Sequence, residues 1–149
     1  MIVVVDASVA AMWFLPDANS QNAARLLDPG YDLAAPDLLS MEVASALLKA
    51  LRRREISAGE AFEALEVLSA AGLRLFPADD YVDRAFQVTR RHGGSLYDGI
   101  YVALAQSLGA PVVTSDTRLA ATATAAGIRA IMISEGPPRP KRGSHRGPD

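Results

Sequence analysis

Residues 2–6 read Ile-Val-Val-Val-Asp, a continuous β-branched run that ends in a carboxylate. Such a run, without polar alternation, is typical of a strand that is buried on both faces of a parallel sheet. The residues that follow, 7–15, predict a short apolar helix that Pro16 closes. A buried strand followed at once by a helix indicates an α/β fold, with Asp6 at the carboxyl end of the first strand.

The same alternation of strands and helices continues along the chain. We expect further strands at 33–35, 73–76, 112–114 and 130–133. Apolar residues recur every three or four positions in the intervening segments, which predicts helices at 20–28, 37–54, 57–72, 79–92, 95–108 and 117–126. Helices between successive strands favour a parallel sheet that helices cover. The predicted fold class is therefore α/β.

Composition narrows both the domain organisation and the chemistry. The 149 residues suit a single domain, which we place at residues 1–135. Residues 136–149 are basic and rich in proline and glycine, so we expect a disordered tail there. The absence of cysteine excludes disulfides, thiol catalysis and cysteine-based zinc sites. Two histidines far apart, His92 and His145, give little support for a histidine-rich metal site or a Ser–His–Asp triad.

Charge and hydropathy bear on location and on partners. No stretch reaches the roughly 18 uninterrupted apolar residues of a membrane span, so we expect a soluble, cytoplasmic protein. The net charge of −2 does not by itself indicate a nucleic-acid-binding protein. Basic residues nevertheless gather at 52–54, at 90–91 and in the tail. Their simplest explanation is solvated helix ends, where cations favour the helix dipole.

Four acidic residues lie where an α/β chain has least need of charge. Asp6 and Asp116 each follow an apolar strand, while Glu42 and Asp98 lie early in apolar helices. The carboxyl ends of parallel strands meet at one edge of the sheet, so we expect these carboxylates to converge there. Their neighbours are mostly apolar, and an unpaired carboxylate in such surroundings is costly or takes up a proton. A bound cation would remove that cost.

The ligand types point to a particular kind of metal and reaction. Oxygen ligands without sulfur or imidazole favour Mg²⁺ or Mn²⁺. Such a cation suits phosphodiester hydrolysis, because it activates water and neutralises charge on the phosphoryl and leaving oxygens. No dinucleotide-binding glycine motif or P-loop is present. Ser8, two residues after Asp6, stands where a phosphoaspartyl phosphatase would need a second acid.

Each acid also fits an ordinary structural role. Asp6 and Asp116 suit helix N-caps, and Asp98 completes a capping-box pattern with Ser95. Glu42 suits a solvent-facing position in the first turns of a helix. Three nearby hydroxyls likewise either support the acids or act as turn and cap groups: Ser8, Thr114 and Ser115.

Four segments, taken in order, carry a family resemblance. They read Val-Val-Asp-Ala-Ser-Val at 4–9, Met-Glu-Val-Ala-Ser-Ala-Leu at 41–47, Tyr-Asp-Gly-Ile-Tyr-Val-Ala-Leu-Ala at 97–105 and Val-Thr-Ser-Asp at 113–116. In this order the chain resembles the PIN-domain ribonucleases, especially the VapC-type toxins, over residues 2 to about 133. The resemblance implies a three-layer α/β/α sandwich with a mainly parallel sheet. It also implies Mg²⁺- or Mn²⁺-dependent RNA cleavage in a pocket formed by Asp6, Glu42, Asp98 and Asp116.

The resemblance further implies partners and a supporting residue. It implies a homodimer and a cognate VapB-type antitoxin that wraps a helical face and blocks the pocket. Ser45 stands three residues after Glu42, where many relatives carry asparagine, and it keeps a hydrogen-bonding group there. The antitoxin contact is expected on apolar helix surfaces that include Trp13 and Phe14, although these aromatic residues equally fit the core.

The resulting interpretation is a metal-dependent endoribonuclease that acts as the toxin of a type II toxin–antitoxin pair. Four arginines are candidates for binding the phosphate backbone of RNA: Arg52, Arg53, Arg90 and Arg91. Two other functions stay open. One is a non-catalytic RNA- or protein-binding module on the same fold, and the other is a metal-dependent phosphatase that acts on a small molecule.

Overall fold

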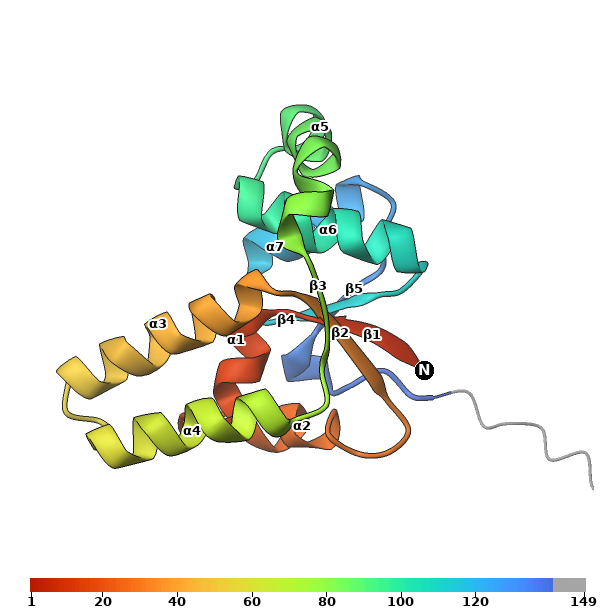
Figure 1. Cartoon of the computed structure of the whole chain (residues 1–149). Helices are drawn as coiled ribbons and strands as arrows, with labels where there is room; N and C mark the ends of the chain where they lie inside the picture. The colour runs from red at the N-terminus through yellow and green to blue at the C-terminus, as the bar shows by residue number, and fades with distance from the viewer. Residues whose placement is uncertain (141–149) are drawn as a thin grey trace, which may run out of the picture.

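Five strands form the centre of the fold, in the order β3-β2-β1-β4-β5 (Figure 1). A computed structural model describes residues 1–140. Every pair of neighbouring strands in the sheet is parallel. The prediction of a parallel sheet is therefore confirmed, with strands β1 (Ile2–Val5), β2 (Asp32–Pro36), β3 (Arg74–Phe76), β4 (Val112–Thr114) and β5 (Ala130–Met132).

The run that opens the chain occupies the middle of this sheet. Val3, Val4 and Val5 are all fully buried. Val3 and Val5 pack into one hydrophobic cluster and Val4 into another, because successive side chains of a strand point to opposite faces. The run is continuously apolar because both faces of β1 are covered.

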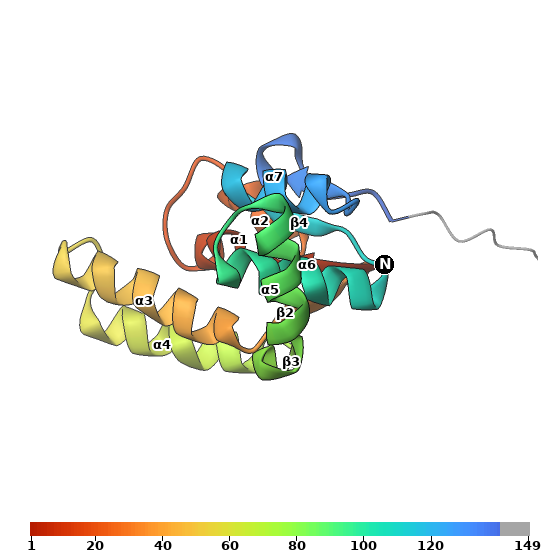
Figure 2. The same cartoon turned by 90° about the horizontal axis from the view of Figure 1, so that it is seen from above.

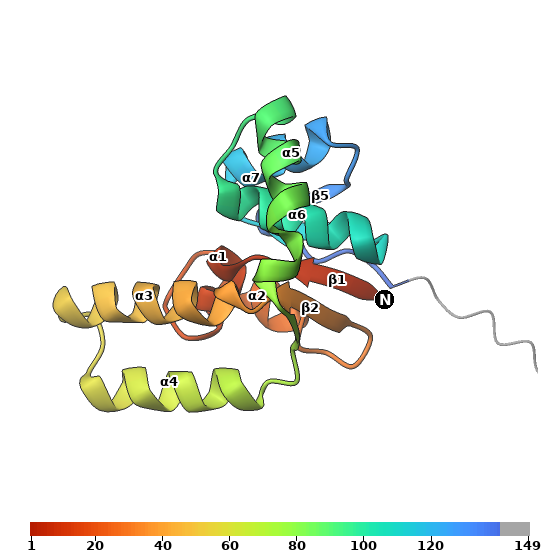
Figure 3. The ribbon, with the colours of Figure 1, turned by 45° about the horizontal axis from the view of Figure 1, so that its top comes forward.

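Helices cover both faces, so the predicted three-layer α/β/α sandwich is confirmed (Figures 1 and 2). One face carries two 3₁₀ turns, η1 (Ala11–Trp13) and η3 (Ile133–Glu135), with α1 (Ala7–Ala10), α2 (Ser20–Arg25), α3 (Leu38–Arg52) and α4 (Ala58–Ala70). The other carries the 3₁₀ turn η2 (Ala78–Tyr81) with α5 (Val82–His92), α6 (Leu96–Leu108) and α7 (Thr117–Ala125). The α3–α4 hairpin projects beyond the sheet (Figure 3).

The strand order creates a switch point between β1 and β4. The chain runs from β1 to β2 and β3 on one side, and then returns to β4 and β5 on the other side. Open α/β sheets bind ligands outside the carboxyl ends of the strands at such a point. Asp6 directly follows β1, and Asp116 follows β4 by one residue, so both lie at this edge.

Several elements end earlier than the sequence suggested. The helix expected at 7–15 is α for only four residues and then tightens into η1. Short 3₁₀ turns are common at the ends of α-helices, and Pro16 prevents continuation. Trp13 and Phe14 pack against the core, and Trp13 Nε1 donates to the Ala23 carbonyl at 2.9 Å. Their core interpretation is therefore the one that the structure supports.

The first residues of the expected tail are packed rather than disordered. Pro137 and Pro138 are buried, and the Tyr31 hydroxyl donates to the Pro138 carbonyl. Proline loses little conformational entropy on ordering, so a short proline-rich segment packs at small cost. The rest of the expected tail, 141–149, lies outside the described residues.

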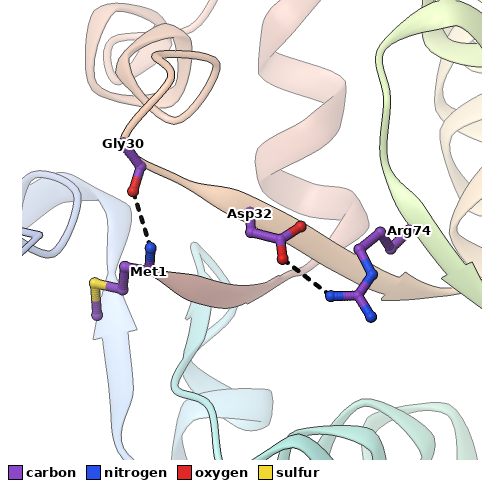
Figure 4. Close-up of polar contacts among 4 residues, drawn as sticks. All are labelled: Met1, Gly30, Asp32 and Arg74. Carbon is purple, nitrogen blue, oxygen red and sulfur yellow. Dashed lines mark hydrogen bonds and ion pairs between the residues drawn. The ribbon is translucent and has the colours of Figure 1, made fainter.

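Polar contacts at the amino-terminal edge of the sheet tie its strands together (Figure 4). The Met1 ammonium donates to the Gly30 carbonyl at 3.0 Å, and Arg74 Nη1 pairs with Asp32 Oδ2 at 2.9 Å. Both members of this pair are about half exposed, so it contributes at most about 1 kcal/mol. None of the helices in residues 1–140 is both long and apolar enough to cross a membrane.

Candidate metal centre

Asp6 is the most enclosed of the four acids. Its side chain is 6% exposed, and its Oδ2 accepts hydrogen bonds from Ser8 Oγ at 2.6 Å and Thr114 Oγ1 at 2.8 Å. Burial raises the pKa of Asp6, these hydroxyl bonds lower it, and the charge of Asp116 raises it again. Asp6 occupies the N-cap position of α1, but its side chain makes no capping bond there. The ordinary cap role therefore does not account for Asp6.

Glu42 lies in the second turn of α3 and faces the site rather than solvent. Tyr101 Oη donates to Glu42 Oε1 at 2.9 Å, and Tyr101 is only 1% exposed. Burial, together with the charges of Asp6 and Asp98, raises the pKa of Glu42 to about 7, although this hydrogen bond lowers it. Burial and the same acidic surroundings raise the pKa of Tyr101, so its hydroxyl remains a donor.

Asp98 and Asp116 combine a capping role with a place beside the other acids. Asp98 Oδ2 accepts from the Ser95 backbone N–H at 3.2 Å, and Ser95 Oγ accepts from the Asp98 N–H at 3.1 Å. Asp116 Oδ1 accepts from the Arg118 N–H at 2.8 Å. The predicted capping box and the predicted cap at Asp116 are both confirmed. These bonds hold each carboxylate at the start of its helix.

The four acids act electrostatically on one another in a chain. Asp116 raises the pKa of Asp6, and Asp6 and Asp98 both raise that of Glu42. In each of the four carboxylates, one oxygen accepts the hydrogen bonds given above. The second oxygen of each carboxylate accepts no hydrogen bond from a side chain in residues 1–140. In the same residues, no three acidic or histidine side chains stand together as a ready-made metal site. The donor chemistry fits a hard cation, but the carboxylates do not share one ligand geometry.

Hydroxyl groups connect the strand ends beneath these acids. Ser8 Oγ lies 3.4 Å from Thr114 Oγ1 and accepts from the Ser115 backbone N–H at 3.1 Å. Thr114 Oγ1 also accepts from the Asp116 N–H at 2.9 Å. Ser8 and Thr114 therefore hold Asp6 directly, whereas the bond from Ser115 comes from its backbone. Ser45 lies with Glu42 in a pocket on the same side of the site, lined by Leu38, Met41, Glu42, Ser45 and Tyr97.

Comparison with known proteins places this chain in a family. Residues 3–125 match the family model described as PIN domain. The chain belongs to the PIN domain family. Ribonuclease VapC3 of Pyrobaculum aerophilum is 35% identical over 122 residues, which cover 80% of this chain and 93% of that protein. Ribonuclease VapC12 of Mycobacterium tuberculosis is 34% identical over 119 residues, which cover 80% and 90% respectively. The resemblance to PIN-domain ribonucleases of the VapC type is confirmed.

Solved structures show the same fold. PAE2754 from Pyrobaculum aerophilum superposes with a TM-score of 0.66 at 24% identity, covering 91% of this chain and 94% of that one. Mycobacterium tuberculosis VapC20, described as a sarcin–ricin loop cleaving toxin, gives a TM-score of 0.63 at 21% identity and covers 85% and 95%. At these identities the likeness establishes the PIN fold alone. The roles of individual side chains rest on the geometry of this chain.

The predicted arginines of this PIN domain fall into two groups. Arg52 and Arg53 lie at the far end of α3, ten residues beyond Glu42 and so about 15 Å along the helix axis. The structure does not bring them to the acids (Figure 1). Arg90 and Arg91 lie in the last turn of α5, which a short link joins to the start of α6 and Asp98. They line a polar groove with Arg84, Gln87, Val88, His92 and Gln106.

Two residues near the acids were missed by sequence reasoning. Tyr101 stands three positions after Asp98, so the two share a face of α6, and this spacing was a usable signal. Its apolar neighbours made it resemble a plain core residue. Arg118 is exposed in the first turn of α7, two residues after Asp116. A lone arginine at that position carries no distinctive pattern in sequence.

Proposed function

We propose that this PIN domain is a divalent-metal-dependent endoribonuclease and the toxin of a type II toxin–antitoxin pair. The observation that carries the proposal is the chain of carboxylates that interact in pairs near the switch point of the sheet. The pKa of Glu42 is about 7 and that of Asp6 is raised. The fold holds these two carboxylates near each other although their negative charges repel. Such an arrangement costs stability unless a ligand compensates for it, and perturbed pKa values gather at functional sites. The names of the VapC relatives support ribonuclease activity.

The residues of the site take distinct roles in this proposal. Asp6, Asp98, Glu42 and Asp116 supply the oxygen ligands that Mg²⁺ or Mn²⁺ prefers. The bound cation would supply an activated water and charge neutralisation at the phosphodiester. Ser8 and Thr114 orient Asp6 through Oδ2, and Tyr101 orients Glu42 through Oε1.

Glu42 and the nearby arginines complete the proposed chemistry. Glu42, which Tyr101 Oη holds at 2.9 Å, is the candidate to orient the attacking water or to accept its proton. Arg90 and Arg91 at the end of α5, with Arg118 at the start of α7, would bind backbone phosphates. Arg52 and Arg53 would contact only a longer RNA that extends along the α3–α4 hairpin.

Purified protein tests this proposal directly. Labelled RNA is incubated with Mg²⁺ or Mn²⁺, and cleavage is compared between the wild type, Asp6→Asn and the control Glu66→Gln, whose carboxylate is exposed on α4. Asp6→Asn should fold normally by circular dichroism and lose metal-dependent cleavage, while Glu66→Gln cleaves as the wild type does. Undiminished cleavage by Asp6→Asn would overturn the assignment. Mapping the cleaved ends in total RNA then identifies the substrate.

A second candidate function is a non-catalytic RNA- or protein-binding module. The observation that favours it is that no three potential ligands in residues 1–140 already stand together as a metal site. Calorimetric titration with Mg²⁺ and Mn²⁺ separates the two functions. The nuclease requires saturable binding that Asp6→Asn weakens, whereas a binding module need bind no metal.

We also propose an antitoxin partner and a homodimer. Solved toxin–antitoxin complexes share this fold, among them one from Klebsiella pneumoniae with a TM-score of 0.56 at 13% identity. The α3–α4 hairpin exposes large apolar side chains that a folded monomer would not need to expose: Leu48, Phe62, Leu65 and Val67. Beside them an apolar groove is lined by Leu39, Ser40, Leu65, Leu68, Ser69, Leu73 and Leu75. Leu39 and Ser40 of this groove precede Glu42 in α3, so an antitoxin segment that docks here would lie near Glu42.

Cell growth and solution mass test these partners. Expression of the chain alone should arrest growth, and co-expression of the neighbouring gene should relieve the arrest. Normal growth with confirmed soluble expression would count against the toxin role while leaving the nuclease intact. Light scattering coupled to size exclusion measures the oligomer, and a monomer at all concentrations would contradict the dimer.

A further inference from the structure

A pocket beside the acids has a chemical composition that the metal site does not explain. It is lined by Leu38, Met41, Glu42, Ser45 and Tyr97. Met41 is 69% exposed and Tyr97 62% exposed, whereas Leu38, which also lines the pocket, is buried. Large apolar side chains held in solvent beside a polar site usually mark a binding surface. The lining of this pocket therefore suits a ligand with apolar faces and a polar edge.

The two exposed side chains are placed by the same backbone that places the acids. Met41 immediately precedes Glu42 in α3, and Tyr97 immediately precedes Asp98 in α6. Residues from the starts of both helices line this one pocket, so these helix starts lie close together. A group bound between Met41 and Tyr97 is thus fixed relative to both acids. A phosphate beside the acids would have its own or its neighbour's nucleobase within reach of this pocket.

Electrostatics favours a neutral contact at this place. The four interacting acids repel RNA phosphates, and Arg90, Arg91 and Arg118 lie on α5 and α7 rather than around this pocket. Affinity next to Glu42 must therefore come from groups that do not depend on phosphate charge. Stacking of a base on an aromatic ring supplies about 1–3 kcal/mol and tolerates any base. A thioether such as that of Met41 also packs well against an aromatic face.

We propose that Met41 and Tyr97 form a stacking site for one unpaired nucleobase next to the scissile phosphate. The proposal rests on the ribonuclease function above and adds the two side chains that hold a base beside the cleavage point. A base inside an A-form duplex keeps its faces stacked on its neighbours and cannot enter this pocket. Ser45, at the pocket edge, offers one hydroxyl to the edge of the bound base.

Binding without metal tests the stacking site apart from catalysis. Anisotropy of a labelled single-stranded oligoribonucleotide is measured in EDTA with the wild type, Tyr97→Phe, Tyr97→Ala and the control Phe86→Ala. Phe86 is 62% exposed on α5 and does not line the pocket, so it matches Tyr97 in exposure. Tyr97→Ala should weaken binding about 10-fold, as expected for one lost stack, while Tyr97→Phe and Phe86→Ala stay within about 2-fold. Met41→Ala should weaken binding in the same direction.

A second set of substrates identifies the base. A set of oligonucleotides is made in which a single abasic position is moved along the strand. At one position only, the abasic oligonucleotide should bind the wild type as weakly as the intact oligonucleotide binds Tyr97→Ala. At that position the abasic change and Tyr97→Ala should not add, because both remove the same contact. An annealed complementary strand should abolish the Tyr97-dependent part of the affinity.

The outcomes separate this inference from the proposed function. Equal binding by the wild type and Tyr97→Ala, or no measurable wild-type binding in EDTA, would overturn the stacking site and leave the nuclease to its own test. Tyr97-dependent binding without any cleavage in Mg²⁺ or Mn²⁺ would keep the stacking site and remove the nuclease. Equal preference for duplex and single strand would also overturn the inference.

Discussion

Replacing Glu42 with glutamine tests the electrostatic description of the acid site. Burial and the charges of Asp6 and Asp98 raise the pKa of Glu42 from 4.5 to about 7. Glutamine is neutral at every pH and has almost the same shape, and its side-chain oxygen still accepts from the Tyr101 hydroxyl. The substitution therefore removes the charge while it keeps the packing and the hydrogen bond.

The size of the effect follows from the pKa. The difference between 4.5 and about 7 corresponds to roughly 3.4 kcal/mol, at about 1.36 kcal/mol for each pH unit. Glu42 is partly exposed, so solvent screening reduces this value and we expect about 1–2 kcal/mol. The folded protein holds the proton more tightly than the unfolded chain does. The stabilisation is therefore complete below pH 4.5 and is lost as the pH rises through about 7.

Thermal unfolding in EDTA measures this difference. At pH 5 and below, the wild type and Glu42→Gln should unfold at similar temperatures. At pH 8 the wild type should unfold roughly 2–8 °C below the variant, because it alone carries the buried charge. Glu66→Gln, which removes an exposed charge from α4, should follow the wild type at both pH values.

One pattern would refute this reasoning. If the gap between the wild type and Glu42→Gln is the same at pH 5 and pH 8, Glu42 is not held in an environment that disfavours its charge. Saturating Mg²⁺ at pH 8 adds a separate comparison. It should stabilise the wild type more than Glu42→Gln if Glu42 is a ligand, since only the carboxylate gains a cation.

Three further substitutions test the contacts around the site. Thr114→Val removes a fully buried hydroxyl that donates to Asp6, and should cost about 1–3 kcal/mol in urea unfolding; an unchanged midpoint would contradict that role. Gly99→Ala would bring a Cβ to 2.7 Å from the Ala85 carbonyl and should cost about 1–3 kcal/mol. The helical control Gly59→Ala meets nothing closer than 3.9 Å and should stabilise slightly, so equal effects of the two alanines would refute the close packing of α6 on α5. Tyr101→Phe should destabilise more at pH 8 than at pH 5, because the charged form of Glu42 loses its donor; a cost independent of pH would contradict this.

Local signals in the sequence predicted most of the fold. The apolar run at 2–5 predicted a doubly covered central strand, because a strand buried on both faces cannot alternate. Ser95 and Asp98 predicted a capping box, since its bonds join residues only three positions apart. The strand–helix alternation predicted a parallel sheet, and with it the edge at which Asp6 and Asp116 would lie. These features depend on residues near one another in the chain.

Features that depend on distant contacts were not predictable in the same way. Arg52 and Arg53 resembled Arg90 and Arg91 in sequence, but only the second pair lies on a helix, α5, that packs against α6 and its Asp98. The early tail appeared disordered by composition, but Tyr31 binds the Pro138 carbonyl and holds it. The contact between Tyr31 and Pro138 joins residues 107 positions apart, and no local pattern encodes it.

The sequence by itself determined the order of strands and helices, the family and the four acids as candidates. Only the tertiary structure decided which side chains hold Asp6 and Glu42. Asp6 is held by a hydroxyl 108 residues away and Glu42 by one 59 residues away, whereas Asp98 and Asp116 cap their own helices. The physical reason is that a pKa depends on burial and on the charges around a group. Those surroundings exist only after α3, α6 and the ends of β1 and β4 have come together.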